Sequence, residues 1–207
     1  SSGVTIMRMD AGVDTGAIIT RREIRLEADE TAGTLSDKLS SLGGELLIET
    51  LPDYLAGKIT LRPQNEEQAT YAAMLKKEAG LLDFSQPAEY LVRQVRAYAP
   101  WPGCYTLWNG EVFKVHRAHA VPAGTDTPQP GTRGAVGDLP ALGTANGWLA
   151  LDEVQPAGKK AMPGAVFLRG ARNWHQTLEE LEGYGDELAF RMLWRGGYRH
   201  LYRRQPG

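Results

Sequence analysis

Residues 104–121 place the tightest constraint on what this chain can fold into. The stretch CYTLWNGEVFKVHRAHAV consists of two strand-like runs on either side of Asn109-Gly110. Asn-Gly favours the positive φ angles of a two-residue turn whose twist matches that of paired strands. The stretch therefore predicts an antiparallel β-hairpin and commits this part of the chain to a β-sheet.

Strand-like and helical sequence patterns on both sides of the hairpin predict that it belongs to a small domain. Residues 134–136 and 148–154 are further strand-like runs, and a long loop rich in Pro, Gly and Thr precedes them. Before the hairpin, an apolar stripe predicts a helix that ends at Pro100; the stripe consists of Ala88, Leu91, Val92, Val95 and Tyr98. One helix followed by several antiparallel strands predicts a β-barrel.

The amino-terminal part of the chain follows a different pattern. Val4–Met9 is an apolar run that ends at a turn, and a second, alternating run begins at Ile18. Thr34-Leu-Ser-Asp37 matches a helix-capping box. One apolar helix face follows, made by Leu35, Leu39, Leu42 and Leu46. Pro52 is expected to bend or end this helix.

The polar stretch KITLRPQNEEQ separates these two patterns and has no helical stripe, so it predicts a linker between domains. We therefore predict an α/β segment over residues 1–57, a linker over 58–70, a β unit over 71–175 and a charged extension over 176–207. The extension is predicted because five acids at 177–190 are followed by five arginines from residue 191 onward.

Composition limits the class of protein. No stretch approaches the roughly 18 to 20 uninterrupted apolar residues of a membrane helix, and the start lacks a secretory layout, so we expect a cytoplasmic protein without membrane contact. The single cysteine, Cys104, fits a reducing compartment. Although the net charge is −2, residues 155–175 carry four basic residues and no acid, so local basic surfaces can hold phosphates.

Two aspartates in the first turn, Asp10 and Asp14, are the first candidates for chemistry. Their spacing alone is weak evidence, because acids in turns usually accept hydrogen bonds from the backbone. Their context is more specific. A carboxylate at a strand end, among glycines that allow close approach of a ligand, suits binding of a polar heterocycle and proton transfer.

Five stretches resemble the folate-dependent formyltransferases, and among them the methionyl-tRNA formyltransferase family. In chain order they are GVTIMRMDAGVDTGAII, AGTLSDKLSSLGGELL, QATYAAMLKKEAGLLDFSQPA, RAYAPWPGCYT, and LDEVQPAGKKAM followed by FLRG. Together they cover about residues 3–170. The resemblance implies the end of a Rossmann-like formyltransferase domain, then a linker and an OB-fold-like barrel that helps to hold tRNA.

The resemblance also implies an activity. The family transfers a formyl group from 10-formyltetrahydrofolate to the amino group of methionine on initiator tRNA, without a metal. In the family's D-x-G turn, matched here by Asp14-Thr15-Gly16, the aspartate orients a histidine and assists proton movement. The residues implied to line the folate pocket are Ala11, Gly12, Val13 and Asp14. Asp10 is expected to serve the turn.

This sequence departs from the family pattern in one respect. The family's Asn-x-His element precedes the strand that opens this chain, so we expect residues 1–207 to be a carboxyl-terminal portion that is inactive alone, the complete enzyme being a monomer. Asn173-Trp174-His175 has the same spacing but lies after FLRG, and we do not expect it to be catalytic. His116 and His119 are three apart in a strand, which points them to opposite faces and argues against a shared metal.

Basic side chains are the candidates for contact with tRNA. Each on its own is more often a solvated surface charge, and the adjacent pair in the GKKAM loop is the strongest candidate because neighbouring lysines can neutralise neighbouring phosphates. The six candidates are Lys159, Lys160, Lys114, Arg117, Arg93 and Arg96. Two other functions stay open. One is a non-catalytic module that binds tRNA or a partner, and the other is a related formyltransferase that acts on another amine.

Overall fold

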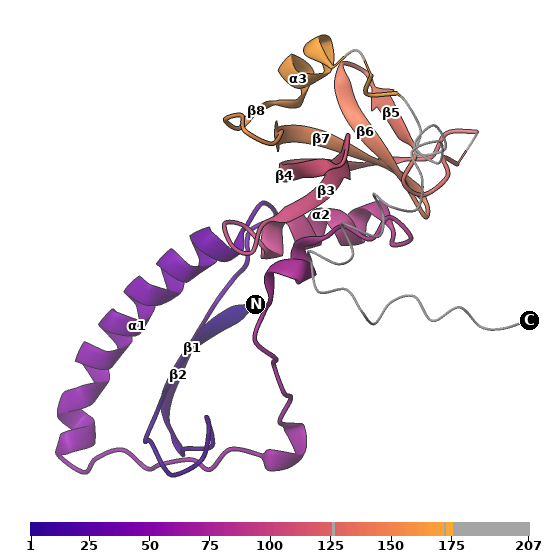
Figure 1. Ribbon diagram of the computed structural model, residues 1–207. Helices are drawn as coiled ribbons and strands as arrows, with labels where there is room; N and C mark the ends of the chain where they lie inside the picture. Colours follow the sequence, from indigo (N-terminus) through magenta and orange to yellow (C-terminus); the bar gives the residue numbers. More distant parts are fainter. Residues whose placement is uncertain (126, 172, 176–207) are drawn as a thin grey trace, which may run out of the picture. The chain divides into compact units, whose positions relative to one another are not determined.

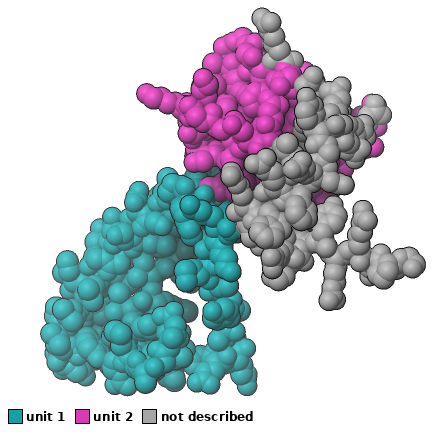
Figure 2. All heavy atoms as spheres, in the orientation of Figure 1, with its two compact units in different colours: residues 1–80, 96–102 teal, residues 81–95, 103–207 magenta. Residues whose placement is uncertain are grey.

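A computed structural model describes residues 1–125, 127–171 and 173–175 (Figure 1). They form two compact units (Figure 2). The first contains residues 1–80 and 96–102, and the second contains residues 81–95 and the described residues from 103 onward. The predicted linker, 58–70, falls within the first unit, and the predicted extension, 176–207, lies outside the described residues.

The first unit consists of a β-hairpin and a long helix. Strands β1 (Ser2–Met7) and β2 (Ile18–Ile24) pair antiparallel, as their apolar runs predict. Helix α1 (Ala32–Leu55) packs against both strands, and a Cβ on Gly43 would lie 3.6 Å from the Val4 side chain. The predicted leucine face is confirmed in part: Leu46 is buried and the other three leucines are half-buried.

Two details of α1 differ from the sequence prediction. The helix is capped by Thr31, three residues earlier than predicted: the Thr31 hydroxyl accepts from the Thr34 N–H at 3.2 Å, and the Thr34 hydroxyl accepts from the Thr31 N–H at 3.0 Å. Pro52 does not end the helix, which continues to Leu55. The Pro52 carbonyl accepts from the Ala56 N–H at 3.0 Å, so the last turn of the helix still closes.

The polar segment after α1 is mostly irregular but is fixed to the hairpin. Arg62 and Ile18 exchange two backbone hydrogen bonds of 3.0 and 2.7 Å. Two short 3-10 helices follow, η1 (Glu66–Gln68) and η2 (Lys77–Gly80). Thus the part of the sequence that predicts a linker also extends the edge of β2.

The second unit is built on the predicted hairpin. Strands β3 (Cys104–Trp108) and β4 (Glu111–Pro122) pair with Trp108 opposite Glu111. The two turn residues have positive φ angles, 50° at Asn109 and 77° at Gly110. The hairpin prediction is therefore confirmed, turn geometry included.

Four more strands and two helices complete this unit. The sheet order is β3-β4-β7-β6-β5, formed with β7 (Gly147–Gln155), β6 (Leu139–Thr144) and β5 (Arg133–Val136), and β8 (Met162–Pro163) pairs with β7. Helix α2 (Ala88–Ala97) begins in this unit, and the Asn146 side-chain oxygen accepts from the N–H of its first residue, Ala88, at 2.9 Å. Helix α3 (Gly164–Gly170) follows β8.

The predicted barrel is not confirmed, because the sheet in the described part of the chain does not close. Strands β3 and β5 are the two ends of the sheet order, and within the described residues no backbone pairing joins them. Instead, the Arg133 side chain at the start of β5 donates to the Leu107 carbonyl of β3 at 3.1 Å. This side-chain hydrogen bond therefore links β5 to β3 where a closed barrel would have a ladder of backbone hydrogen bonds.

Four aromatic rings form the centre of the second unit: Trp108, Phe113, Phe167 and Trp174. Their centroids lie 4.8 to 6.3 Å apart. Trp174 is fully buried and its Nε1 donates to the Gly134 carbonyl at 2.7 Å. Within the Asn-Trp-His stretch, Trp174 is therefore a core residue, whereas Asn173 is half-buried and His175 is exposed.

The hairpin turn gives a stability prediction. Gly110→Ala is expected to destabilise the second unit by about 1 to 2 kcal/mol, because an L side chain at φ 77° is strained. Gly124→Ala is the control: the Gly124 φ lies outside the left-handed region and a Cβ there meets no described atom within 4 Å. Urea unfolding of both variants is the measurement. Equal midpoints for both would contradict the prediction.

Candidate active site

The loop between β1 and β2 is organised by the Asp10 carboxylate. Its Oδ1 accepts from the Gly12 N–H at 3.0 Å and from the Thr15 hydroxyl at 2.6 Å. The Thr15 hydroxyl, followed by the Gly12 N–H, holds the pKa of Asp10 below its ordinary value. Asp10 thus serves the turn, as the sequence predicts.

Asp14 has a different environment in the same loop. It is exposed and its φ is 57°, in the left-handed region. Its backbone carbonyl accepts from Gln64 Nε2 at 2.8 Å. Within the described residues, no hydrogen bond or ion pair engages the Asp14 carboxylate, so this acid is free to meet a ligand.

The close packing around Gly16 leaves room only for glycine at this position of the D-x-G turn. Gly16 is buried, and a Cβ at this position would lie 2.0 Å from the Arg8 carbonyl oxygen. The Arg8 N–H donates to the Ala17 carbonyl at 2.9 Å, which closes the base of the loop. The chain therefore makes a tight return at Gly16, and Asp14 stands two residues before it.

The loop surrounds a pocket of about 150 Å³. Its lining residues are Met7, Met9, Asp10, Gly12, Val13, Asp14, Thr15 and Gly16. Three of the four residues expected to line a folate pocket are among them, and Ala11 is not. Val13 and Met9 are 90% and 85% exposed, which gives the pocket an open apolar rim beside the Asp14 carboxylate.

The three lysine candidates for phosphate contact belong to one end of the β4–β7 pair. Lys114 lies opposite Gln155 in the sheet register, and Gln155 donates from Nε2 to the Lys159 carbonyl at 2.9 Å. Gln155 Oε1 also lies 2.9 Å from His116 Nε2. Gln155 thus fixes the loop that carries Lys159 and Lys160, and all three lysine side chains are exposed.

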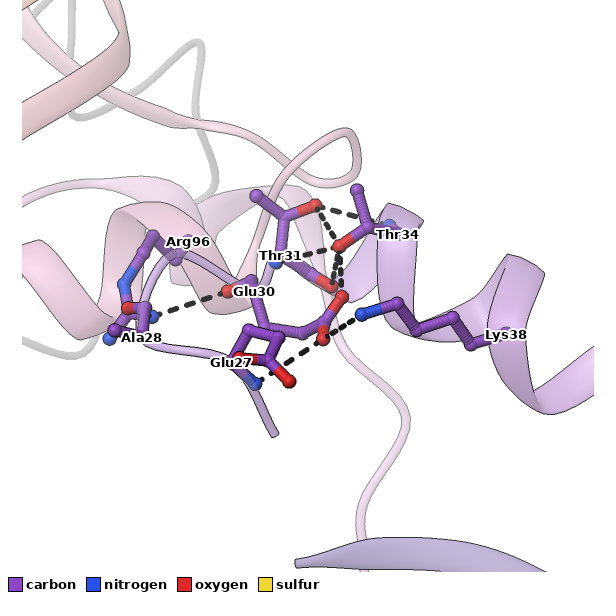
Figure 3. A network of polar contacts seen from close by, with 7 residues as sticks. All are labelled: Glu27, Ala28, Glu30, Thr31, Thr34, Lys38 and Arg96. Atoms are coloured by element: carbon purple, nitrogen blue, oxygen red, sulfur yellow. Dashed lines mark hydrogen bonds and ion pairs between the residues drawn. The ribbon is translucent and has the colours of Figure 1, made fainter. Parts of the chain in front are cut away.

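The three arginine candidates are spread more widely. Arg117 lies opposite Glu153 on β4, and Arg93 is exposed on α2 near Glu89. Arg96 belongs to the first unit, where its Nη1 donates to the carbonyls of Ala28 and Glu30 (Figure 3). Arg96 is thus engaged within the first unit, whereas the other five basic candidates belong to the second unit.

The start of α1 is held by the network to which Arg96 belongs (Figure 3). Lys38 Nζ lies 2.7 Å from Glu30 Oε2, and the Thr34 hydroxyl donates to Glu30 Oε1. Lys38, followed by Thr34, holds the pKa of the Glu30 carboxyl below its ordinary value. Arg96 thus contributes to the polar packing before α1, a role that its choice as a candidate for tRNA contact did not indicate.

Histidines and acids do not form a metal centre in the described part of the chain. No group of three His, Cys, Asp or Glu side chains there could hold a metal ion. His119 Nδ1 pairs with Asp152 Oδ1 at 3.0 Å, whereas His116 faces Gln155. Among the described helices, none is both long and apolar enough to cross a membrane.

Sequence reasoning missed Gln64. Its amide nitrogen donates to the carbonyls of both Asp14 and Gly16, at 2.8 and 2.7 Å. Gln64 is separated from the turn by about fifty residues, in a stretch whose polar, irregular pattern predicts only a linker. No local periodicity could have indicated this contact.

Family models match most of the chain. A model described as "Formyl transferase" matches residues 1–51, and one described as "Formyl transferase, C-terminal domain" matches residues 74–172. Curated relatives include the methionyl-tRNA formyltransferase of Roseiflexus sp. (strain RS-1), 42% identical over 83% of this chain and 53% of that protein. The methionyl-tRNA formyltransferase of Bacillus subtilis (strain 168) is 44% identical over 82% of this chain and 54% of that protein.

Solved structures share the fold at lower identity. HypX from Aquifex aeolicus in complex with tetrahydrofolic acid has a TM-score of 0.58 and 18% identity, over 84% of this chain and 30% of that one. An N-formyltransferase from Helicobacter canadensis, with folinic acid and dTDP-3-aminofucose, has a TM-score of 0.57 and 17% identity, over 74% of this chain and 55% of that one. The chain spans about half the length of the curated relatives it matches. With both domain models matched in order and relatives above 40% identity, the chain belongs to the formyltransferase family.

Proposed function

We propose that this chain is the carboxyl-terminal part of a methionyl-tRNA formyltransferase, which transfers a formyl group from 10-formyltetrahydrofolate to the amino group of methionyl initiator tRNA. The observation that carries the proposal is the free Asp14 carboxylate beside the pocket formed by its own loop. The names of the relatives above 40% identity support the same activity.

Asp14 is the catalytic residue in this proposal. When an amine attacks a formyl carbon, the amine loses a proton and the departing folate nitrogen gains one. In the family, an aspartate in this position orients the histidine of an Asn-x-His element and assists that proton movement. An Asp14 carboxylate that has no partner among the described residues, on a turn fixed at Gly16, suits this role.

The folate donor is proposed to lie against the loop at Ala11, Gly12, Val13 and Asp14. The pocket combines backbone polar groups, small residues and the apolar rim of Met9 and Val13, which suits a flat polar heterocycle. Tetrahydrofolic acid is part of the related HypX complex, which supports a folate-type donor. No metal is part of the proposed reaction.

The second unit is proposed to hold tRNA. Lys114, Lys159 and Lys160 lie at one end of the β4–β7 pair and are the first residues to test. The open sheet of the second unit is compatible with the partly open barrel of OB folds, and the OB-like description is part of this proposal. The monomeric state of the complete enzyme and its cytoplasmic location also stay predictions.

The lysine pair gives a binding prediction. Replacing Lys159 and Lys160 by Ala is expected to weaken initiator-tRNA binding and to lower the slope of log affinity against log salt by roughly two, because two phosphate contacts are lost. The adjacent lysines Lys76 and Lys77, replaced in the same way, provide the control with an equal charge change. Filter binding over a salt series is the measurement, and equal slopes for the two variants would contradict the assignment.

A second candidate function is transfer to an amino sugar. It is favoured by the structural similarity to the Helicobacter canadensis N-formyltransferase, whose structure contains dTDP-3-aminofucose. The test joins the amino-terminal half of the Bacillus subtilis relative to this chain and offers the chimera initiator Met-tRNA and the amino sugar separately. Formylation of Met-tRNA alone supports the proposal. Formylation of the sugar alone would replace it, and tRNA binding without any transfer would favour a non-catalytic module.

A further inference from the structure

The side chain of Gln64 connects the polar segment after α1 with the proposed catalytic turn. Its Nε2 lies 2.8 Å from the Asp14 carbonyl oxygen and 2.7 Å from the Gly16 carbonyl oxygen. Both acceptors are backbone carbonyls, and the Gln64 amide NH₂ has two hydrogens, one for each of them; a longer contact of 3.9 Å joins the same nitrogen to Met7 Sδ. The two bonds span Thr15 and fix both ends of the Asp14-Thr15-Gly16 turn.

The position of Gln64 is itself fixed. Two residues earlier, Arg62 exchanges two backbone hydrogen bonds with Ile18, the first residue of β2. Gln64 is therefore held at the edge of the same hairpin that carries the turn. The contact belongs entirely to the first unit.

The turn needs such a support at Asp14. A non-glycine residue at φ 57° is unusual and persists when neighbouring contacts hold it. Gly16 is fixed by its lack of a side chain and Asp10 organises the other side of the loop. Within the described residues, Gln64 is the side chain that bonds the backbone of Asp14 itself.

We propose that Gln64 is a positioning residue that holds the backbone of Asp14 so that the carboxylate stands in its reactive position at the pocket. This inference rests on the proposed function for its catalytic consequence and on the two hydrogen bonds for its structural part. Gln64 does not touch the reacting atoms, and it acts through the conformation of residue 14.

The test replaces Gln64 by Glu and, separately, by Met. Glutamate keeps the shape but has no hydrogen to donate and places a negative charge against two carbonyls; methionine removes the donors without adding charge. Hydrogen exchange is measured on the full 207-residue chain, and kinetics on the chimera with the Bacillus subtilis amino-terminal half. Gln68→Glu, an exposed glutamine in η1, is the matched control.

Both variants are expected to speed exchange in residues 8–17 about fivefold or more, because the turn loses its two bonds. They are expected to lower kcat by about tenfold to a hundredfold and to change the KM for Met-tRNA less than about twofold, as for a misplaced catalytic group. Gln68→Glu should leave both properties at the level of the unmodified chain.

Three results decide the inference. Unchanged exchange and kcat in the Gln64 variants would overturn it, and faster exchange throughout the first unit would also overturn it in favour of general stability. If exchange and kcat change in Gln64→Glu but not in Gln64→Met, the change comes from charge repulsion, and the positioning role of Gln64 is overturned. If the unmodified chimera transfers no formyl group, the proposed function fails, while the exchange data still decide whether Gln64 fixes the turn.

Discussion

Asp14→Asn is expected to lower formyl transfer by the chimera by about 10²- to 10⁴-fold, the range for loss of a general acid–base group. Asparagine has nearly the same shape, and the Asp14 backbone contacts to Gln64 remain possible. In the proposed mechanism, the change removes only the negative charge that would orient the histidine of the family's Asn-x-His element. The measurement is single-turnover formylation of initiator Met-tRNA, which isolates the chemical step from product release.

Asp10→Asn is the matched control for this prediction. The Asp10 oxygen accepts from Gly12 and Thr15, and an amide oxygen can accept the same two hydrogen bonds. The expected loss is therefore less than about tenfold, from weaker, uncharged hydrogen bonds in the loop. Equal losses in the two variants would show that the loop needs both charges and would remove the special role of Asp14.

Trp174→Ala is expected to destabilise the second unit by about 3 to 5 kcal/mol, the usual cost of deleting a large buried aromatic side chain. Trp174 is 0% exposed and contacts three other aromatic rings. Its removal leaves a large cavity and deprives the Gly134 carbonyl of its 2.7 Å hydrogen bond. Denaturant unfolding followed by the fluorescence of the remaining tryptophans measures the loss.

Trp101→Ala is the control because Trp101 is 54% exposed. The same truncation there is expected to cost less than about 1 kcal/mol, since little apolar area is uncovered. Trp174→Phe should fall between the two, because it keeps a ring in the cluster but loses the indole N–H. A Trp174→Ala midpoint equal to that of Trp101→Ala would contradict the assignment of Trp174 to the core.

The elements predicted best are those whose signal is local. Asn109-Gly110 needs only its own backbone preference to form the turn, and the leucine spacing of α1 needs only the helical period. The cap of α1 was placed three residues too late, because Thr31 and Thr34 both present a hydroxyl and sequence alone does not show which one lies outside the helix.

Contacts between distant segments could not be predicted from periodicity. Asn146 binds the first turn of α2 from a loop 58 residues away, and Gln64 reaches Asp14 across 50 residues. One helix followed by several antiparallel strands predicts a barrel, yet closure of the barrel depends on whether the two end strands pair. Arg133 occupies that position with its side chain, and nothing in the β5 sequence pattern indicates this.

The candidate site was predicted through the family resemblance and refined by geometry. The sequence showed two acids with similar surroundings, and resemblance favoured Asp14. The structure adds the physical distinction: Asp10 is engaged in two turn hydrogen bonds, whereas Asp14 has a positive φ and its carboxylate meets no hydrogen-bond partner in the described part of the chain. Which acid serves the fold follows from hydrogen-bond partners that a spacing pattern does not contain.

We propose that this chain supplies the acid and the tRNA-holding unit of a methionyl-tRNA formyltransferase. The most direct test is the yield of formylmethionyl initiator tRNA from 10-formyltetrahydrofolate, with the chimera that joins the amino-terminal half of the Bacillus subtilis relative to this chain. We predict formylation by this chimera and its loss with Asp14→Asn. A folded chimera that binds tRNA but forms no formylmethionyl-tRNA, or one whose activity is unchanged by Asp14→Asn, would contradict the claim.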